Sequence, residues 1–174
     1  VTEGYLDAVV YWLKHRHQWA IDPEWIVISQ GVVKALNQAV KAFTKPGEGV
    51  VIMTPVYYPF YSAAACNGTH VVENPLILCE DHYEIDFEDL KQKLADPMNT
   101  MLILCTPHNP IGKVFTYEEL KQIGELALKY GVLIVADEIH NDLIMPGFTH
   151  TMFPTIDKAF EENCIVCTSP SKTF

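Results

Sequence analysis

An acid, a glycine turn and a lysine in this sequence have the residue types and surroundings needed to bind a charged small molecule. Asp137 follows the apolar run 132–136, where a carboxylate is costly to bury unless a cation or a strong hydrogen-bond donor lies beside it. Gly31 precedes an apolar helical pattern, and the free amides and dipole of such a helix can hold a phosphate. Lys172 offers an amine, which is a nucleophile toward carbonyl compounds. We take these residues as candidates for one binding site.

A folded scaffold must position such residues, and the hydrophobic pattern predicts an α/β domain. Short apolar runs alternate with amphipathic helical patterns, as in a mainly parallel sheet that is covered on both faces. We expect strands at 26–29, 50–53, 70–73, 101–105, 132–136 and 164–168. We expect helices at 4–19, 32–43, 57–66 and 86–94, and a fifth between the capping box 116–119 and Gly131. The predicted fold class is therefore α/β, with three layers in the order α/β/α.

Polar stretches follow four of these predicted strands. They are residues 30–33, 106–112, 137–140 and 169–172. Ligands of open parallel sheets collect beyond the carboxyl ends of the strands, so we expect the four stretches to share one crevice. Each stretch has an ordinary structural explanation when taken alone, and their coincidence at one sheet edge is the stronger signal.

Charge and composition narrow the range of partners. The 174 residues include 12 Lys and Arg against 22 Asp and Glu, a net charge of −10, which argues against a nucleic-acid partner. The longest apolar runs are too short to cross a bilayer and no leader-like segment opens the chain, so we expect no membrane partner. Five irregularly spaced cysteines favour a reducing, cytoplasmic location. We expect a single domain over residues 1–174 that is cut short at both ends.

The histidine and cysteine spacings argue against a metal site. His15 and His17 lie two residues apart on a predicted helix and cannot face one ion. Cys164 and Cys167 lie three apart in a predicted strand and point to opposite faces, which opposes a zinc knuckle or a redox pair. We therefore expect no metal cofactor.

The motifs in these stretches resemble those of the fold-type I pyridoxal-phosphate family, whose large domain is that of aspartate aminotransferase. A phosphate-binding glycine turn, P-x-Y, N-P-x-G, D-E-[IV] and S-x-S-K occur here in the family's order. Longer strings resemble the MalY/PatB-type cystathionine β-lyases, or C–S lyases: TPVYYPF, NGTHVVENPL, YEIDFEDL, PHNPIGKVFT, DEIHNDL and SPSKTF. The resemblance covers nearly the whole chain. It implies that residues 1–174 form the cofactor-binding large domain.

The resemblance assigns roles around pyridoxal 5'-phosphate to five residues. Lys172 is implied to be the lysine that forms the Schiff base with the cofactor and then acts as general base at the substrate α-carbon. Asp137 is implied to keep the pyridine nitrogen protonated, and Asn109 to donate to the phenolic oxygen. Tyr57 is implied to stack on the ring, with Ile139 on the opposite face.

Further positions follow the same resemblance with less specific signals. The amides of Gly31, Val32 and Val33 and the hydroxyl of Ser169 are implied to bind the cofactor phosphate. Two further candidates are Tyr58, as a second hydroxyl near the cofactor, and His140, where many aminotransferases have tyrosine and the β-lyases read D-E-I-H. Thr106 stands where relatives have asparagine, so no role is assigned to it.

The resemblance implies an enzyme that acts on a small amino acid. The favoured reaction is α,β-elimination on a cysteine-type substrate such as cystathionine, which releases a thiol, pyruvate and ammonia. An aminotransferase shares the early steps, and the residues do not separate the two by physics alone. An effector-sensing relative of aminotransferases is a third hypothesis. Ser169-x-x-Lys172 also fits the S-x-x-K motif of serine acyl-transfer enzymes, but their S-D-N and K-T-G partners are absent from this sequence.

The family also implies features that this chain does not supply. Its members are expected to form homodimers, in which a tyrosine from the neighbouring subunit reaches the site. The arginine that binds the substrate carboxylate lies nearer the C-terminus in the family, and neither residue can be assigned in this sequence.

Overall fold

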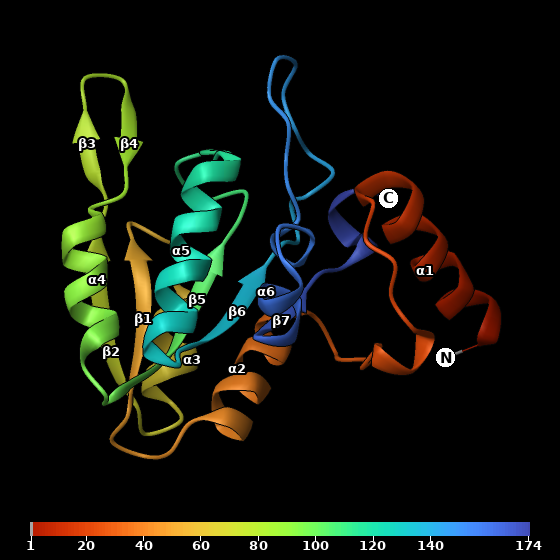
Figure 1. Ribbon diagram of the computed structural model, residues 1–174. Helices are drawn as coiled ribbons and strands as arrows, with labels where there is room; N and C mark the ends of the chain where they lie inside the picture. The colour runs from red at the N-terminus through yellow and green to blue at the C-terminus, as the bar shows by residue number, and fades with distance from the viewer. Residues whose placement is uncertain (1) are drawn as a thin grey trace.

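The computed structural model describes residues 2–174 and contains a five-stranded parallel sheet in the order β2-β1-β5-β6-β7 (Figure 1). Continuous apolar runs form its central strands because both faces of the sheet are covered. All six residues of β1 are buried, as are six of the seven in β5. The strands are β1 (Gly49–Thr54), β2 (His70–Pro75), β5 (Asn99–Cys105), β6 (Leu133–Asp137) and β7 (Cys164–Cys167).

Helices pack against both faces of the sheet, which confirms the three-layer α/β/α prediction. The first core cluster joins one face of the sheet to α4 (Phe87–Ala95), α5 (Tyr117–Tyr130) and α6 (Lys158–Glu162). The second joins the other face to α2 (Val32–Phe43) and α3 (Pro59–Ala65). Alternate residues of β1 enter the two clusters, as strand geometry requires.

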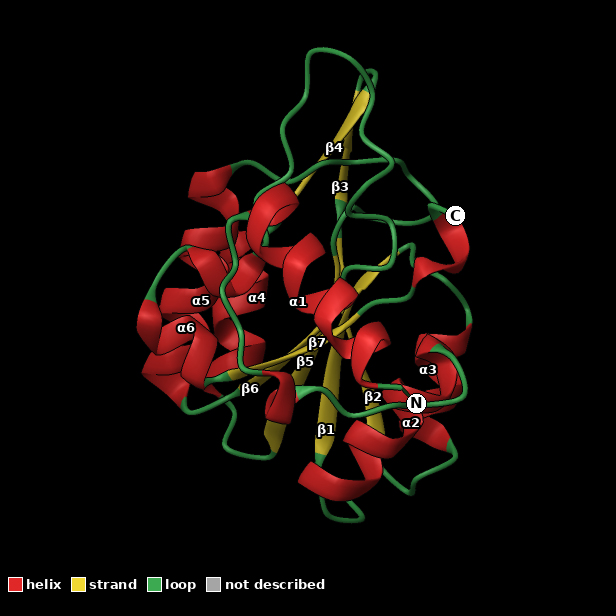
Figure 2. Cartoon of the chain, turned by 90° about the vertical axis from the view of Figure 1, so that its right-hand side faces the viewer, coloured by secondary structure: helices red, strands yellow, loops and turns green. Residues whose placement is uncertain are grey.

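Two elements lie outside these layers (Figures 1 and 2). Helix α1 (Glu3–His17) stands beside the β7 end of the sheet and contributes one buried side chain, Leu13. An antiparallel hairpin of β3 (Ile77–Cys79) and β4 (His82–Glu84) stands above α4 in Figure 1 and projects beyond the edge to which the strand arrows point. The short 3-10 turns are η1 (Pro23–Trp25), η2 (Phe153–Thr155) and η3 (Pro170–Lys172).

The predicted strand at 26–29 is wrong. These residues have no regular secondary structure and connect η1 to α2. Val27 is 86% exposed and Ile28 is 51% exposed, so the apolar run covers no core in this chain. A short apolar run satisfies a strand pattern without revealing whether a partner strand exists. The hairpin β3–β4 is not predicted either, because each of its strands is only three residues long and shows no periodic pattern.

The caps of α5 form as predicted. Thr116 Oγ1 accepts from the Glu119 amide at 3.2 Å, and Glu119 Oε2 accepts from the Thr116 amide at 2.8 Å. Gly131 ends the helix at φ 69°, a left-handed conformation that suits glycine. These contacts place α5 directly before β6, the strand that ends in Asp137.

Replacement of Gly124 by alanine is expected to lower the free energy of unfolding by about 1–3 kcal/mol. A methyl group at Gly124 in α5 would overlap the ring of Phe160. That ring is 3% exposed and stacks on Phe153, so it has little room to move. Urea denaturation measures the change. Gly4 of α1 is the control, because a methyl group there meets no atom within 4 Å, and equal stability of the two variants would contradict the packing argument.

Candidate active site

The loops at the carboxyl ends of β1 and β5 meet at the point where the strand order reverses. From β1 the chain passes to β2 on one side, and it later returns to β5 on the other side of β1. Such switch points open a crevice between neighbouring loops. Here the Tyr57 amide donates to the Asn109 carbonyl at 3.0 Å, and His108 Nε2 lies 2.9 Å from the Pro55 carbonyl. These contacts hold the predicted residues Tyr57 and Asn109 side by side.

Asp137 is a buried carboxylate with a single hydrogen-bond donor. It is the last residue of β6 and is 4% exposed. Its Oδ1 accepts from the Ile139 amide at 3.2 Å, and within residues 2–174 no cationic side chain forms an ion pair with it. Burial raises the pKa of Asp137 from 3.8 to about 6, and the nearby charge of Glu138 adds to this effect. The carboxylate therefore lacks the partner that would normally balance a buried charge.

Two buried thiols flank Asp137 across the sheet. The strand register places Cys105 of β5 and Cys167 of β7 directly opposite Asp137. Burial, together with the Asp137 charge, raises the pKa of each thiol to about 12, so both remain neutral. The Cys105 sulfur also accepts from the Asn109 amide at 3.3 Å. These neighbours are not evident from the sequence, because only the register between strands reveals them.

The residues implied to bind a phosphate lie at the start of α2 and in the turn after β7. Gly31 caps α2 at φ 99°, and no side chain caps the first amides of the helix. Helix α2 leads into β1, so its first turn faces the carboxyl edge of the sheet. Val32 is buried in the core, whereas Val33 is 38% exposed. Ser169 caps η3, and its Oγ accepts from the Ser171 amide at 3.3 Å.

His140 and Lys172 lie near each other at the same edge. Lys172 ends η3 just beyond β7, the neighbour of β6, and its side chain is exposed. His140 follows β6 and is partly buried. Burial lowers the pKa of His140, and the charge of Lys172 lowers it further. Histidine at this position is therefore neutral near pH 7.

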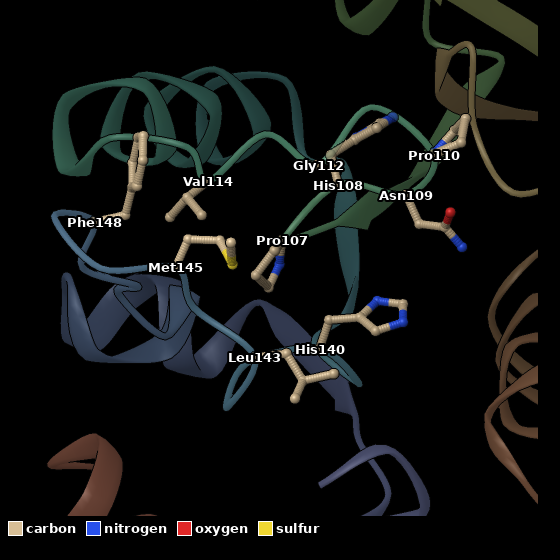
Figure 3. Close-up of a pocket in the computed structure, with 10 residues that line it drawn as sticks. All are labelled: Pro107, His108, Asn109, Pro110, Gly112, Val114, His140, Leu143, Met145 and Phe148. Carbon is tan, nitrogen blue, oxygen red and sulfur yellow. The ribbon is translucent and has the colours of Figure 1, made fainter.

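A cavity of about 290 Å³ opens between the loop after β5 and the loop after β6. Figure 3 shows Asn109 and His140 at one end of this cavity and the apolar side chains of Met145 and Phe148 at the other. The arrangement suits a ligand with a polar end and an apolar end. The lining residues are Pro107, His108, Asn109, Pro110, Gly112, Val114, His140, Leu143, Met145 and Phe148.

The aromatic pair and Thr106 occupy different environments. The rings of Tyr57 and Tyr58 meet edge to face with centroids 5.2 Å apart, and Tyr58 is the more exposed at 75%. Thr106 is fully buried, and its amide donates to the Asp137 carbonyl at 3.0 Å. Its hydroxyl has no partner among residues 2–174, and Thr106 directly follows the last residue of β5.

Asp142 connects the segment that bears Lys172 to α1, although the sequence pattern predicts no role for it. Its carboxylate accepts from Trp12 Nε1 at 3.0 Å and from the Thr173 hydroxyl at 3.2 Å, and it lies 3.0 Å from His17 Nε2. The side chain of Asp142 is 8% exposed. Its place in the string DEIHNDL was the available signal, but nothing in the sequence indicated its partners.

A second buried acid follows Asp137 directly. Glu138 is fully buried, and its carboxylate lies 2.7 Å from His150 Nε2 and accepts from the Phe153 amide at 2.9 Å. Burial raises the pKa of Glu138, while His150 opposes that effect. Glu138 thus anchors the long loop that follows β6, including the part that lines the cavity.

Comparison with known proteins identifies the family of this fold and site. A model of the family described as aminotransferase class I and II matches residues 4–174. The chain belongs to the class I and II aminotransferase family. This membership confirms the fold-type I resemblance found in the motifs.

The relatives of this aminotransferase-family chain include several named lyases. Cystathionine beta-lyase PatB of Bacillus subtilis is 49% identical over an alignment that covers 97% of this chain and 43% of the relative. Protein MalY of Escherichia coli is 32% identical over an alignment that covers 99% of this chain and 44% of the relative. Cystalysin from Treponema denticola, whose crystal structure contains pyridoxal 5'-phosphate, superposes with a TM-score of 0.97 at 46% identity, over 99% of this chain and 44% of cystalysin. The chain thus spans less than half the length of the relatives it matches.

The relatives of this chain also include proteins named as transaminases. Kynurenine–oxoglutarate transaminase 3 of Mus musculus is 31% identical over 91% of the chain and 36% of the relative. The fold alone therefore does not separate the two reaction types. Within residues 2–174, no helix combines the length and apolar character that a membrane span requires.

Proposed function

We propose that this chain is the cofactor-binding large domain, residues 1–174, of a pyridoxal-phosphate-dependent carbon–sulfur lyase. The proposed reaction is α,β-elimination on a cysteine-type amino acid, with release of a thiol, pyruvate and ammonia. The observation that carries the proposal is the buried Asp137 carboxylate, which has no cationic partner among residues 2–174 and has neutral thiols on both sides. The relatives named as lyases support the choice of reaction.

The residues at the crevice fit pyridoxal 5'-phosphate as their cofactor. Asp137 offers a carboxylate to a protonated ring nitrogen, which supplies the missing positive charge. Asn109 offers an amide to the phenolic oxygen, and Tyr57 and Ile139 offer apolar surfaces to the two faces of the ring. The free amides at Gly31, Val32 and Val33, with the Ser169 hydroxyl, suit the phosphate. The hydroxyl of Tyr58 is the proposed second hydroxyl near the cofactor.

Lys172 is the proposed site of covalent attachment and the group that moves the proton. When bound, the cofactor supplies an electron sink for the carbanion at the substrate α-carbon. Once the Lys172 amine is released, it takes the α-proton. His140 lies beside this amine and is neutral, so it places no second positive charge next to the protonated lysine. The Thr173 hydroxyl donates to the Asp142 carboxylate, which tethers the residue next to Lys172.

Cystathionine turnover by the full-length protein tests the proposal. We expect pyruvate and a thiol to appear in equal amounts with cystathionine, as detected by a lactate dehydrogenase coupled assay and a thiol reagent. Transfer of the amino group to a 2-oxo acid without pyruvate release would show an aminotransferase instead. Cofactor binding without either reaction would favour an effector sensor, and either outcome would refute the lyase proposal.

We also propose that the intact protein is a cytoplasmic homodimer. The five cysteines are free in the structure, which suits a reducing compartment. Size-exclusion chromatography with light scattering tests the dimer, and a monomeric holoenzyme that turns over substrate would contradict it.

Loss of the Asp142 side chain is expected to lower kcat roughly 10–100-fold with a smaller change in KM. The reason is positional: the Asp142→Ala variant frees Thr173 and lets the neighbouring Lys172 amine move from the geometry that proton transfer needs. Steady-state kinetics measures kcat and KM separately. The Asp142→Asn variant keeps an acceptor oxygen and is expected to recover part of kcat. Equal kcat in wild type and Asp142→Ala would contradict the role.

A further inference from the structure

The β3–β4 hairpin gathers a thiol, an imidazole and a carboxylate on one of its faces. Cys79 pairs directly with His82 across the antiparallel ladder. Glu84 lies two residues after His82, and residues two apart in a strand point to the same side. None of these residues belongs to the crevice described above, because the hairpin projects beyond the sheet as a separate element (Figure 1).

The ligand atoms of these three residues are close enough to share one ion. One atom from each of Cys79, His82 and Glu84 lies within 4.8 Å of the others. His82 Nε2 lies 3.1 Å from Glu84 Oε1. Ligands at ordinary zinc bond lengths of about 2.0–2.3 Å are separated by roughly 3–4 Å in a tetrahedral site. Small side-chain rotations therefore bring the Cys79 sulfur into place.

A fourth residue orients the imidazole. Asp81 Oδ1 lies 3.0 Å from His82 Nδ1, on the opposite side of the ring from Glu84. A histidine that binds a metal usually donates its other ring N–H to a carboxylate or carbonyl, which fixes the tautomer and the ring direction. Asp81 provides that acceptor. This arrangement leaves Nε2 as the coordinating nitrogen, facing Glu84.

We propose that Cys79, His82 and Glu84 form a binding site for a thiophilic divalent cation of the zinc class, with Asp81 as the orienting partner of His82. Thiolate and imidazole ligands favour zinc over magnesium or calcium, which prefer sites made of oxygen atoms. The exposed position of the hairpin leaves the fourth coordination place to water. Binding replaces the Cys79 S–H proton, which passes to solvent, by a bond from sulfur to the cation.

The charge around the cluster fits this assignment. Carboxylate oxygens of Asp81 and Glu84 lie 3.0 Å and 3.1 Å from the two ring nitrogens of His82. The hairpin therefore carries a local excess of negative charge. A divalent cation offsets that excess and would connect β3 to β4 across the turn, so its binding is expected to make the hairpin more rigid.

Isothermal titration of the full-length holoenzyme with Zn²⁺ tests the site. We expect one site that is lost in Cys79→Ser and in His82→Asn, and that binds 10- to 100-fold more weakly in Asp81→Asn, as is usual when the orienting carboxylate is removed. Cys66→Ser and His70→Asn are the controls, since they remove an exposed thiol and an exposed imidazole outside the hairpin. They are expected to bind Zn²⁺ as the wild type does.

Two further measurements keep the result specific to the hairpin. Titration in buffers of different ionisation enthalpy is expected to show release of at least one proton per Zn²⁺ in the wild type, from the Cys79 thiol and from any protonated His82. A large excess of Mg²⁺ is expected to leave Zn²⁺ binding unchanged. Unaltered Zn²⁺ affinity in Cys79→Ser or His82→Asn would overturn the proposal, and so would displacement of Zn²⁺ by Mg²⁺. None of these results depends on elimination activity.

Discussion

Replacement of Lys172 by alanine is expected to abolish covalent attachment of the cofactor and to lower kcat for elimination by roughly 10²–10⁴-fold or more. The variant loses both the amine that attaches the cofactor and the group that removes the α-proton. Absorbance spectroscopy of the full-length protein after dialysis measures the attachment, and the pyruvate assay measures the rate.

The control for this variant is Lys129→Ala. Lys129 is exposed in the last turn of α5, and its Nζ lies 5.2 Å from the centre of the Tyr130 ring. Because α5 leads into β6, Lys129 lies at the edge of the sheet opposite the crevice. Its replacement is expected to leave both measurements unchanged. Cofactor that stays covalently bound to the Lys172→Ala variant would show that another amine forms the attachment, and the assignment of the site would then fail.

The Asp137→Asn variant is expected to weaken cofactor binding or kcat/KM by roughly 10²–10³-fold. Removal of one partner from a buried ion pair costs about 3–5 kcal/mol, and each 1.4 kcal/mol corresponds to a factor of ten. Asparagine keeps the shape of the side chain, so the loss reports the charge rather than packing. Equilibrium titration with pyridoxal 5'-phosphate measures the affinity, and an affinity within threefold of wild type would contradict the assignment.

For the cofactor-free protein, we expect Asp137 to make the free energy of unfolding depend on pH. The pKa of Asp137 is about 6 in the folded chain and 3.8 ordinarily, so the folded state holds this proton more tightly than the unfolded state does. Stability from this group is therefore present at low pH and is lost as the pH rises from about 4 through 6, by about 3 kcal/mol in total. Asparagine does not ionise, so the Asp137→Asn variant is expected to keep its stability over this pH range as far as this group is concerned. The difference between the urea denaturation curves of the two proteins across pH 4–7 isolates it.

The repeating order of strands and helices could be predicted from the sequence because local patterns specify it. Thr116 and Gly131 mark the ends of α5, and the apolar run before Asp137 marks β6. The run at 26–29 failed because hydrophobicity does not say whether a strand will find a partner. Register is a property of pairs of strands, so the placement of Cys105 and Cys167 beside Asp137 could not be read from the chain alone.

The candidate site was predictable where a motif has a distinctive pattern and unpredictable where it depends on distant partners. The structure brings the Tyr57 and Asn109 backbones together through one hydrogen bond. The roles given to these side chains remain predictions that the variants above test. Asp142 escaped notice because its partners Trp12 and Thr173 lie 130 and 31 residues away, and no local pattern encodes such contacts.

Helix α1 has few buried contacts with the rest of the chain, and this affects how the molecule opens. It buries only Leu13, and its hydrogen bonds from Trp12 and His17 converge on Asp142. Segments with little buried apolar surface open locally at a small free-energy cost, so the amide hydrogens of α1 should exchange with solvent sooner than those of β5. Each such opening also frees Asp142. Transient lifting of a peripheral helix would thereby loosen the short segment that carries Lys172, while the sheet beneath stays intact.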